Sequence, residues 1–255
     1  MIDIHSHILP GLDDGADCLE ESLAMLRMAA EAGTTDIVAS PHANDRYPYD
    51  PETVRSKIAE VQEASRESIK VHRGCDFHLS FSNIQDALKN PTKYTINGGS
   101  YILVEFSDMA LPPNALTIFD DMLAAGMVPI ITHPERNPII RNNLAMVSAW
   151  VEHDCLVQVT GDSFLGRFGK AAMKAANALM ERNLVHVIAS DAHNTRSRTP
   201  ALSEAHAHVA SHYSQEHAEA LFVSYPRAIL SGQPVDTAFL MSVRRRSRTW
   251  RIPWW

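Results

Sequence analysis

The chain has 255 residues, of which 45% are hydrophobic and 21% are charged, a balance typical of a globular protein with a large core. The net charge of −7 argues against a general attraction to nucleic acid, and no uninterrupted apolar run approaches the roughly 18 residues of a membrane span. Cys18, Cys75 and Cys155 form no CxxC pair, and no charged-then-apolar leader opens the sequence, so we expect a reducing compartment, the cytoplasm.

Short apolar runs alternate with amphipathic segments along the chain. A first strand begins at Ile2, and six more predicted strands follow at 37–40, 69–74, 101–105, 128–132, 155–160 and 185–190. Predicted helices occupy 19–32, 114–125, 142–153, 170–182, 203–212 and 215–223, and another starts at Pro51 after a capping Asp50. The segment 79–97 shows less regular patterning. Alternation of strands and helices predicts parallel strands with right-handed crossovers, and no linker divides the chain.

Acidic or imidazole side chains stand at the end of six of the seven predicted strands or just beyond it. They are His5, His7, His42, Asp76, Glu105, His133, Asp191 and His193, and Asp14 joins them in the loop after the first strand. The pairs His5/His7 and Asp191/His193 occupy alternate positions, so both members can face one site. Because parallel strands of a closed sheet end at the same rim, these residues are expected to converge there.

Each of these residues has an ordinary structural alternative when taken alone. Asp14 lies in Asp13-Asp14-Gly15, a typical turn sequence, and His42 or His133 alone is more often a structural histidine. Their coincidence at one rim favours metal binding. At about four ligands per ion, nine ligands suit two or three ions with a bridging carboxylate. Ligation by His, Asp and Glu without thiolate is compatible with Zn²⁺, Mn²⁺ or Fe.

Two arginines follow the predicted ligands closely. Arg136 comes after His133-Pro134-Glu135, and Arg198 lies a few residues beyond His193. A guanidinium fork binds phosphate with two parallel hydrogen bonds, although most arginines are simple surface residues. We expect both to bind substrate and to act in catalysis. The sequence contains neither a CxxxxxR loop nor a GxxxxGK loop.

At this point the sequence resembles the PHP-type (polymerase and histidinol phosphatase) metal-dependent protein-tyrosine phosphatases of bacterial capsule and exopolysaccharide clusters. The resemblance covers roughly residues 1 to 234. It rests on the segments 1–7, 13–15, 19–23, 40–42, 104–106, 133–136, 183–186 and 190–194.

The resemblance implies a distorted (β/α)7 TIM-like barrel, the PHP fold, that holds three divalent metal ions. By similarity, His5, His7, Asp76 and Asp191 would hold the first ion, and Asp76, Glu105 and His133 the second, with Asp76 bridging. Asp14, His42 and His193 would hold the third. Mn²⁺ is the expected metal, with Fe or Zn²⁺ as alternatives. Arg136 and Arg198 match the arginines that bind phosphate.

The sequence departs from the family pattern in two places. The bridging position is usually Glu, and the shorter Asp76 could shift the metal spacing or weaken one site. A basic, Trp-rich stretch also closes the chain, with Arg244, Arg251 and Trp255 among its residues. We therefore divide the chain into a metallophosphatase barrel at 1–235 and an extension at 236–255.

The expected substrate is phosphotyrosine in the tail of a bacterial tyrosine kinase that drives polysaccharide export. Contact with the membrane would then be indirect, through the kinase. No nucleic-acid partner is expected, and a homo-oligomer is compatible with the sequence. Two alternatives stay open: a phosphoesterase acting on nucleic acid or on a small molecule such as histidinol phosphate, and a catalytically weak regulatory scaffold, which the Asp76 departure makes conceivable.

Overall fold

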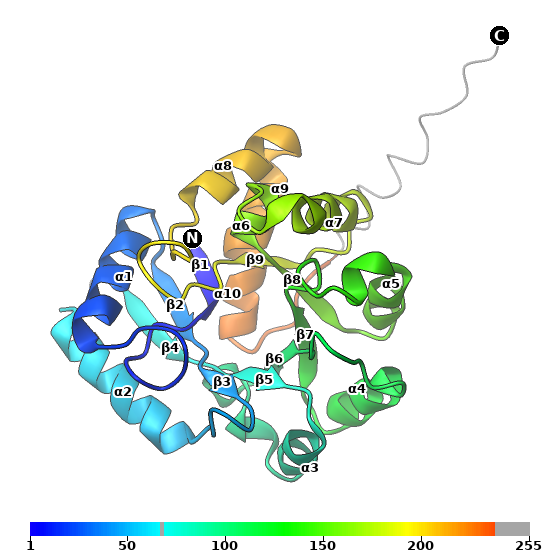
Figure 1. Ribbon diagram of the computed structural model, residues 1–255, viewed down its shortest axis with the longest axis horizontal. Coiled ribbons are helices and arrows are strands. Elements are labelled where there is room, and N and C mark those ends of the chain that lie inside the picture. The colour runs from blue at the N-terminus through cyan, green and yellow to red at the C-terminus, as the bar shows by residue number, and fades with distance from the viewer. Residues whose placement is uncertain (67–68, 238–255) are drawn as a thin grey trace.

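In the computed structural model, helices surround a ring of strands (Figure 1). The structure describes residues 1–66 and 69–237. The strands in the described residues are β1 (Ile2–Ser6), β2 (Asp36–Ala39), β3 (His42–Ala43), β4 (Lys70–Arg73), β5 (Asp76–His78), β6 (Tyr101–Glu105), β7 (Val128–Thr132), β8 (Leu156–Thr160) and β9 (Val187–Ala189). All of their pairings are parallel. This confirms the predicted strand direction.

Two of the seven predicted strands are interrupted, and the interruptions distort the barrel. The strand predicted at 37–40 continues after Ser40-Pro41 as β3, and β4 continues after Gly74-Cys75 as β5. Pro41 has no N–H to give to a strand ladder, which accounts for the first break. As a result, β1-β2-β4 form one sheet and β3-β5-β6-β7-β8-β9 form the other.

Backbone contacts between β1 and the residues after β9 close the ring. Asp191 N donates to His5 O at 2.9 Å, and His7 N donates to Ala192 O at 2.8 Å. We count β2 and β3 as one interrupted strand, and β4 and β5 as another. The barrel then has seven strands, and their order around the ring returns to β1. The predicted distorted (β/α)7 barrel is confirmed.

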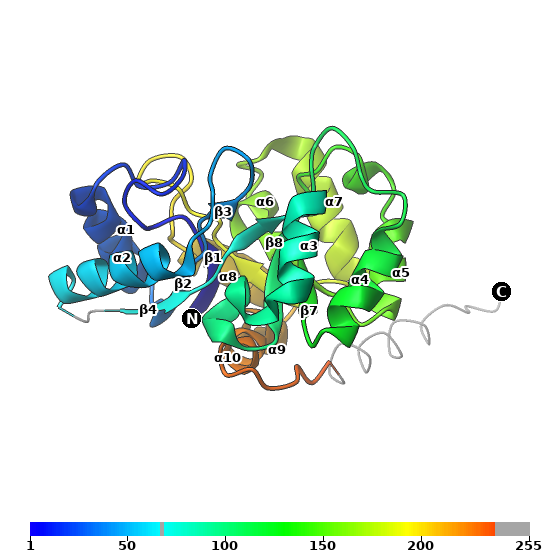
Figure 2. The same ribbon diagram turned by 90° about the horizontal axis from the view of Figure 1, so that it is seen from below.

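Helices cover the outside of the ring and one of its ends. They are α1 (Leu19–Glu31), α2 (Pro51–Ala64), α3 (Phe81–Lys89), α4 (Ala115–Ala124), α5 (Ala145–Glu152), α6 (Gly161–Phe164), α7 (Gly169–Glu181), α8 (Ser203–His212), α9 (Gln215–Glu219) and α10 (Tyr225–Leu230). In the side view, α9 and α10 lie at one end of the barrel, and long loops lie at the other (Figure 2). Tyr101, at the start of β6, donates to Gln233 O at 2.8 Å, so the C-terminal helices cover the end where the strands begin. The opposite end of the barrel, where the strands finish, is therefore free to carry the functional site.

The core consists of two clusters of buried apolar residues. One lies between β2, β4 and the helices α1 and α2, with Met25, Ile37 and Val61 among its members. A larger cluster fills the rest of the barrel and its helical coat, and it includes Phe77, Leu103 and Phe119. Strands buried on both faces have apolar runs rather than alternating ones, as the sequence shows.

Three helical segments differ from the prediction. The segment 79–97, predicted as irregular, contains α3, whose N-cap Ser80 accepts a hydrogen bond from Asn83 N at 3.3 Å. The helix predicted from Asn142 begins at Ala145, because Ile140–Asn142 forms a separate 3-10 turn. The last predicted helix continues beyond Val223 through a π-turn (Ala220–Ser224) into α10. By contrast, Asp50 caps α2 as predicted, accepting from Thr53 N at 2.8 Å.

The predicted C-terminal extension is described only at its start. Asp236 and Thr237 belong to the described residues, whereas 238–255, with the basic and Trp-rich stretch, lie outside them. Within the described part of the chain, no helix is long and apolar enough to cross a membrane.

Candidate metal centre

The nine side chains predicted as metal ligands lie together at the end of the barrel where the strands finish. Four overlapping groups have ligand atoms within 4.8 Å of one another: His7, Asp14, His42 and His193; His5, His7 and Asp76; His5, His133 and Asp191; and His42, Asp76 and Glu105. Every predicted ligand belongs to at least one group. Residues that are up to 188 positions apart in the chain (His193 against His5) therefore meet at one rim.

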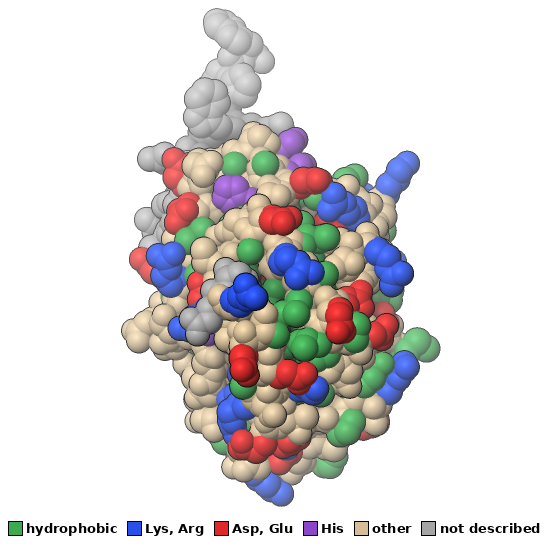
Figure 3. Space-filling model, turned by 90° about the vertical axis from the view of Figure 1, so that its left-hand side faces the viewer, with side chains coloured by type: hydrophobic (Ala, Val, Ile, Leu, Met, Phe, Trp, Pro, Cys, Tyr) green, Lys and Arg blue, Asp and Glu red, His purple; other side chains and the backbone are tan. Residues whose placement is uncertain are grey.

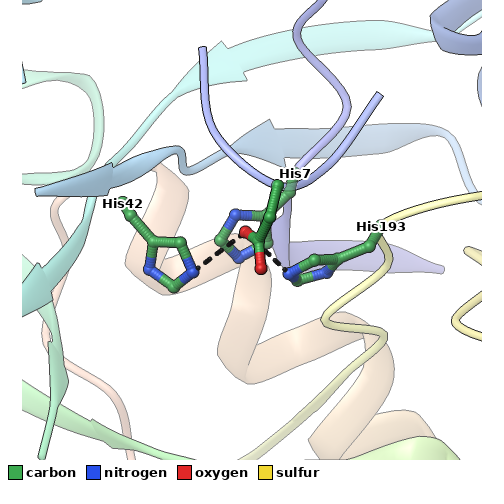
Figure 4. A group of neighbouring side chains, drawn as sticks. His7, His42 and His193 are labelled. Atoms are coloured by element: carbon green, nitrogen blue, oxygen red, sulfur yellow. Dashed lines mark ion pairs between the residues drawn. The ribbon is translucent and has the colours of Figure 1, made fainter. Parts of the chain in front are cut away.

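Three imidazoles surround the carboxylate of Asp14. His42 Nε2 and His193 Nε2 lie 3.3 and 3.5 Å from Asp14 Oδ1, and dashed lines mark these two ion pairs (Figure 4). The His7 ring lies between the other two, with its centroid 4.0 Å from that of His193 and 4.5 Å from that of His42. Burial and the neighbouring His7 lower the pKa of His193 to about 4, so this imidazole is neutral, as a metal ligand must be.

Asp76 lies at the middle of the cluster and is fully buried. Its Oδ2 is 3.1 Å from His42 Nδ1 and 3.5 Å from His5 Nε2, yet neither carboxylate oxygen forms a hydrogen bond of regular geometry with the described residues. Burial alone would raise the pKa of Asp76, but His5 and His42 outweigh it and hold the pKa well below its usual value. A buried carboxylate without hydrogen bonds is costly, and a divalent cation would remove that cost.

The remaining predicted ligands complete the rim. Asp191 Oδ1 lies 3.4 Å from Nε2 of both His5 and His7. Glu105 Oε1 lies 3.8 Å from His133 Nε2. Burial and the nearby Arg136 keep the pKa of His133 well below its usual value, so this imidazole is also neutral.

The three ligand sets implied by family resemblance map unevenly onto these groups. Asp14, His42 and His193 share one group, as in the third set. The four residues of the first set are divided between two groups. Asp76 and Glu105 of the second set share a group with His42 rather than with His133.

Three of the histidines are oriented by hydrogen bonds at Nδ1. The partners are Gln158 Oε1 for His5 at 3.0 Å, Asp13 Oδ2 for His7 at 2.6 Å and the Asp191 carbonyl for His193 at 3.1 Å. With Nδ1–H directed to these acceptors, the Nε2 lone pair of each ring is left for a cation. This is the usual arrangement of metal-binding histidines. Together with the unsatisfied Asp76, it shows that the donor set fits divalent cations.

Asp13 and Gln158 were not predicted as site residues. Asp13 adjoins Asp14 and was interpreted only as part of a turn. Gln158 is fully buried in β8, the one predicted strand without a ligand at its end. A polar side chain in the middle of the apolar run Leu156-Val157-Gln158-Val159 was the signal for it.

The backbone is constrained where the site residues leave the strands. His133, just after β7, has a φ of 35°, and Asp191, just after β9, has a φ of 50°, in the left-handed region that non-glycine residues rarely adopt. Such conformations persist where the surrounding structure holds them, often at functional sites. Gly15 is required for a different reason, because a Cβ there would lie 2.0 Å from His7 O.

The two predicted arginines converge on one ligand. Arg136 Nη1 and Arg198 Nη2 both donate to Asp191 Oδ2. The Arg136 guanidinium also lies over the Phe168 ring, 4.3 Å from its centroid. Arg198 Nε is buried and finds no acceptor among the described residues, which leaves a donor for an anion.

A cavity of about 510 Å³ opens beside the cluster. Four of the predicted ligands and Arg136 line it: Asp14, His42, Glu105 and His133. Other polar and aromatic side chains also line it, among them Asn44, Arg46, Tyr47, Phe106, Arg141 and Phe168. The cavity can therefore hold an anion against the cluster and an aromatic group above it.

Residues 1–231 match the family model described as capsular polysaccharide synthesis, CpsB/CapC. The chain belongs to this family. Tyrosine-protein phosphatase YwqE of Bacillus subtilis is 37% identical over 202 residues, which cover 78% of this chain and 79% of the relative. Tyrosine-protein phosphatase CpsB of Streptococcus pneumoniae is 33% identical over 245 residues, which cover 91% and 99%.

Solved structures agree with the family assignment. A structure from work on YwqE of Bacillus subtilis and CpsB of Streptococcus pneumoniae, described as unique metal-dependent tyrosine phosphatases, superposes with a TM-score of 0.86. It is 33% identical, and the match covers 92% of this chain and 96% of the other. A lactonase from Listeria monocytogenes has a TM-score of 0.61 at 11% identity, with 91% and 95% covered, and shows the fold alone.

Proposed function

We propose that this CpsB/CapC family member is a metal-dependent protein-tyrosine phosphatase. The observation that carries the proposal is the cluster of nine His, Asp and Glu side chains at one rim, with two arginines converging on it beside a cavity. Relatives that are 33% and 37% identical bear the name tyrosine-protein phosphatase, which supports the reaction.

The cluster would hold three divalent ions, with Mn²⁺ as the proposed metal. His5, His7, Asp76 and Asp191 would serve the first, Asp76, Glu105 and His133 the second, and Asp14, His42 and His193 the third. Bound divalent cations supply a water of lowered pKa and neutralise charge on a phosphoryl group. Gln158 and Asp13 hold His5 and His7 in orientation for this task.

The residues of the chain that would act directly on the substrate are arginines and aromatic side chains. Arg136 and Arg198 would bind the phosphoryl oxygens and stabilise the charge that they carry in the transition state. Phe168 packs on the Arg136 guanidinium and fixes its position. Phe106 and Tyr47 line the same cavity and offer apolar surface to the phenol ring of phosphotyrosine.

The proposed substrate is the phosphotyrosine tail of a bacterial tyrosine kinase that acts in polysaccharide synthesis. The description of the family as one of capsular polysaccharide synthesis supports this setting. A cytoplasmic location is proposed because the three cysteines are free, as expected in a reducing compartment. The barrel at 1–235 would carry the activity, with 236–255 as an extension.

Turnover after metal removal tests the proposal. Protein treated with a chelator should lose hydrolysis of p-nitrophenyl phosphate and of a phosphotyrosine peptide, and added Mn²⁺, Fe²⁺ or Zn²⁺ should restore it to different degrees. Histidinol phosphate and single-stranded DNA should be poor substrates. Chelator-insensitive turnover would contradict metal dependence, and full metal content without turnover on any phosphoester would favour a regulatory scaffold.

A further inference from the structure

A second groove adjoins the cavity of the metal cluster. It lies between the start of α5 and α7, which are neighbours in Figure 1, and has a volume of about 540 Å³. Arg141 lines both this groove and the cavity, and its Nη1 donates to the backbone oxygen of Arg136 at 3.3 Å. The groove therefore begins at Arg141, whose side chain contacts the backbone of Arg136, one of the two arginines proposed to bind phosphate.

The groove is purely cationic, although the protein has a net charge of −7. Arg141, Lys174 and Arg182 are its charged lining residues, and no Asp or Glu joins them. Lys174 and Arg182 are exposed and form no ion pair within the described residues. The side of the molecule that carries α1 and α2 differs, because Lys and Arg are interspersed there with Asp and Glu (Figure 3).

The floor of the groove is formed by small side chains. Ala171, Ala175 and Ala178 follow one another at helical spacing along α7 and line it. Side chains of this size let a peptide backbone approach the helix closely. Asn143 also lines the groove and offers an amide group that can bond to such a backbone, whereas Nδ2 of the neighbouring Asn142 already donates to Pro138 O at 2.8 Å.

We propose that this groove binds an acidic segment next to the phosphotyrosine of the protein substrate. The assignment rests on the proposed function and deepens it, because it defines the sequence that the enzyme prefers. With the phosphate at Arg136, the chain on one side of the tyrosine passes Arg141 and enters the groove. Asp or Glu side chains, or a further phosphate, then meet Lys174 and Arg182. Complementary charge of this kind selects the partner and raises the association rate.

The test compares phosphotyrosine peptides that differ only in their flanks. One series carries Glu residues on one side, another on the other side, and two more carry neutral or Lys flanks. For the preferred acidic peptide, kcat/KM should exceed that of the neutral peptide by about fivefold, the size expected for two exposed ion pairs, and the ratio should fall as salt is added. Binding is measured separately, by fluorescence anisotropy of the same peptides with a non-hydrolysable phosphonate in place of phosphotyrosine.

The decisive variant is Lys174→Gln combined with Arg182→Gln. In this variant the ratio between acidic and neutral peptides should fall close to one, both in kcat/KM and in binding affinity. Turnover of p-nitrophenyl phosphate should be unchanged, since neither residue lines the cavity. The control is Arg27→Gln combined with Lys57→Gln on α1 and α2, which removes the same charge from the mixed surface and should keep the preference. Equal binding of acidic and neutral peptides, or a preference that survives in the groove variant, overturns the inference while the phosphatase assignment stands. Failure to hydrolyse any phosphotyrosine compound overturns the proposed function instead, and the anisotropy measurement still tests the groove.

Discussion

Asp13 Oδ2 lies 2.6 Å from His7 Nδ1 and also accepts the backbone N–H of His42 at 3.0 Å. One carboxylate thus fixes two of the predicted ligands without belonging to the metal cluster itself. Burial raises the pKa of Asp13, but the adjacent His7 more than compensates and the pKa falls to about 2. Asp13 is therefore a charged acceptor throughout the physiological pH range.

Replacing Asp13 with Asn should weaken metal binding without removing a ligand. The amide keeps the shape but loses the charge that holds the His7 tautomer, and changes of this kind reduce metal affinity by about 10- to 100-fold. Titration of chelator-treated protein with Mn²⁺, followed calorimetrically, measures the effect. Asp17→Asn, in the same loop but exposed, is the matched control. Unchanged affinity in the Asp13 variant would show that His7 is oriented by something else.

Arg136→Ala should reduce kcat/KM for p-nitrophenyl phosphate by about 100-fold, the usual effect of losing one donor to a charged transition state. Inorganic phosphate should inhibit the variant more weakly than the wild type, because the guanidinium would bind its oxygens. Circular dichroism and metal content should stay unchanged. Arg27→Ala on α1 provides the control. If KM, kcat and inhibition by phosphate are all unaffected, Arg136 has no role in binding the phosphoryl group.

The barrel was predictable because most strands are apolar runs, and six of the seven are followed by an acidic or imidazole side chain that the core would not tolerate without a partner. The interruptions were harder to foresee. Pro41 marks one of them. At the other, Gly74 was interpreted as the end of the strand predicted at 69–74, and its continuation as β5 was not foreseen. The helix α3 was missed although Ile84, Ala87 and Leu88 recur at helical spacing within it. Ala87 is its one buried residue, and Phe81 at its start is 81% exposed.

The predicted ligands could be picked out from the sequence because they stand at the ends of strands, and the ends of parallel strands in a closed barrel lie at one rim. The residues that support them could not be found in this way. Gln158 reaches His5 across 153 positions of sequence, and only the closed ring brings β8 and β1 close enough for that contact. The cationic groove was equally hidden, because Arg141 and Arg182 come from two elements whose packing no local pattern specifies.

Phe119→Ala should destabilise the fold by about 3–5 kcal/mol, the range for removing a fully buried aromatic side chain. The Phe119 ring packs edge-on against Phe106 and Trp150, with centroids 6.0 and 5.9 Å away, so the cavity left behind cannot collapse easily. Chemical denaturation of metal-loaded protein measures the loss. Phe81→Ala, the same substitution at an exposed position, should change the free energy of unfolding by less than about 0.5 kcal/mol. Similar losses in both variants would place Phe119 outside the core.

His186 should make the protein less stable in mild acid. It is buried and accepts a hydrogen bond from Val157 N at 3.1 Å, and burial lowers its pKa to about 4. Between that value and the ordinary pKa of about 6.5, the unfolded chain binds a proton that the folded chain excludes, so stability falls as the pH falls through this window. With the pKa of His186 at about 4 in the folded chain and about 6.5 in the unfolded chain, the free energy of unfolding at pH 4 is lower by roughly 3 kcal/mol.

The variant His186→Asn separates this titration from that of the metal cluster. The amide oxygen can accept from Val157 N but takes up no proton, so the variant should lose roughly 3 kcal/mol less than the wild type between pH 6.5 and 4. Above pH 7 the variant gains nothing from this effect, because histidine is neutral there in both states. His212→Asn, at an exposed histidine, should follow the wild-type curve. Urea denaturation across this pH range, at fixed metal concentration, measures all three proteins. Parallel curves for wild type and His186→Asn would mean that the His186 ring accepts a proton inside the folded barrel.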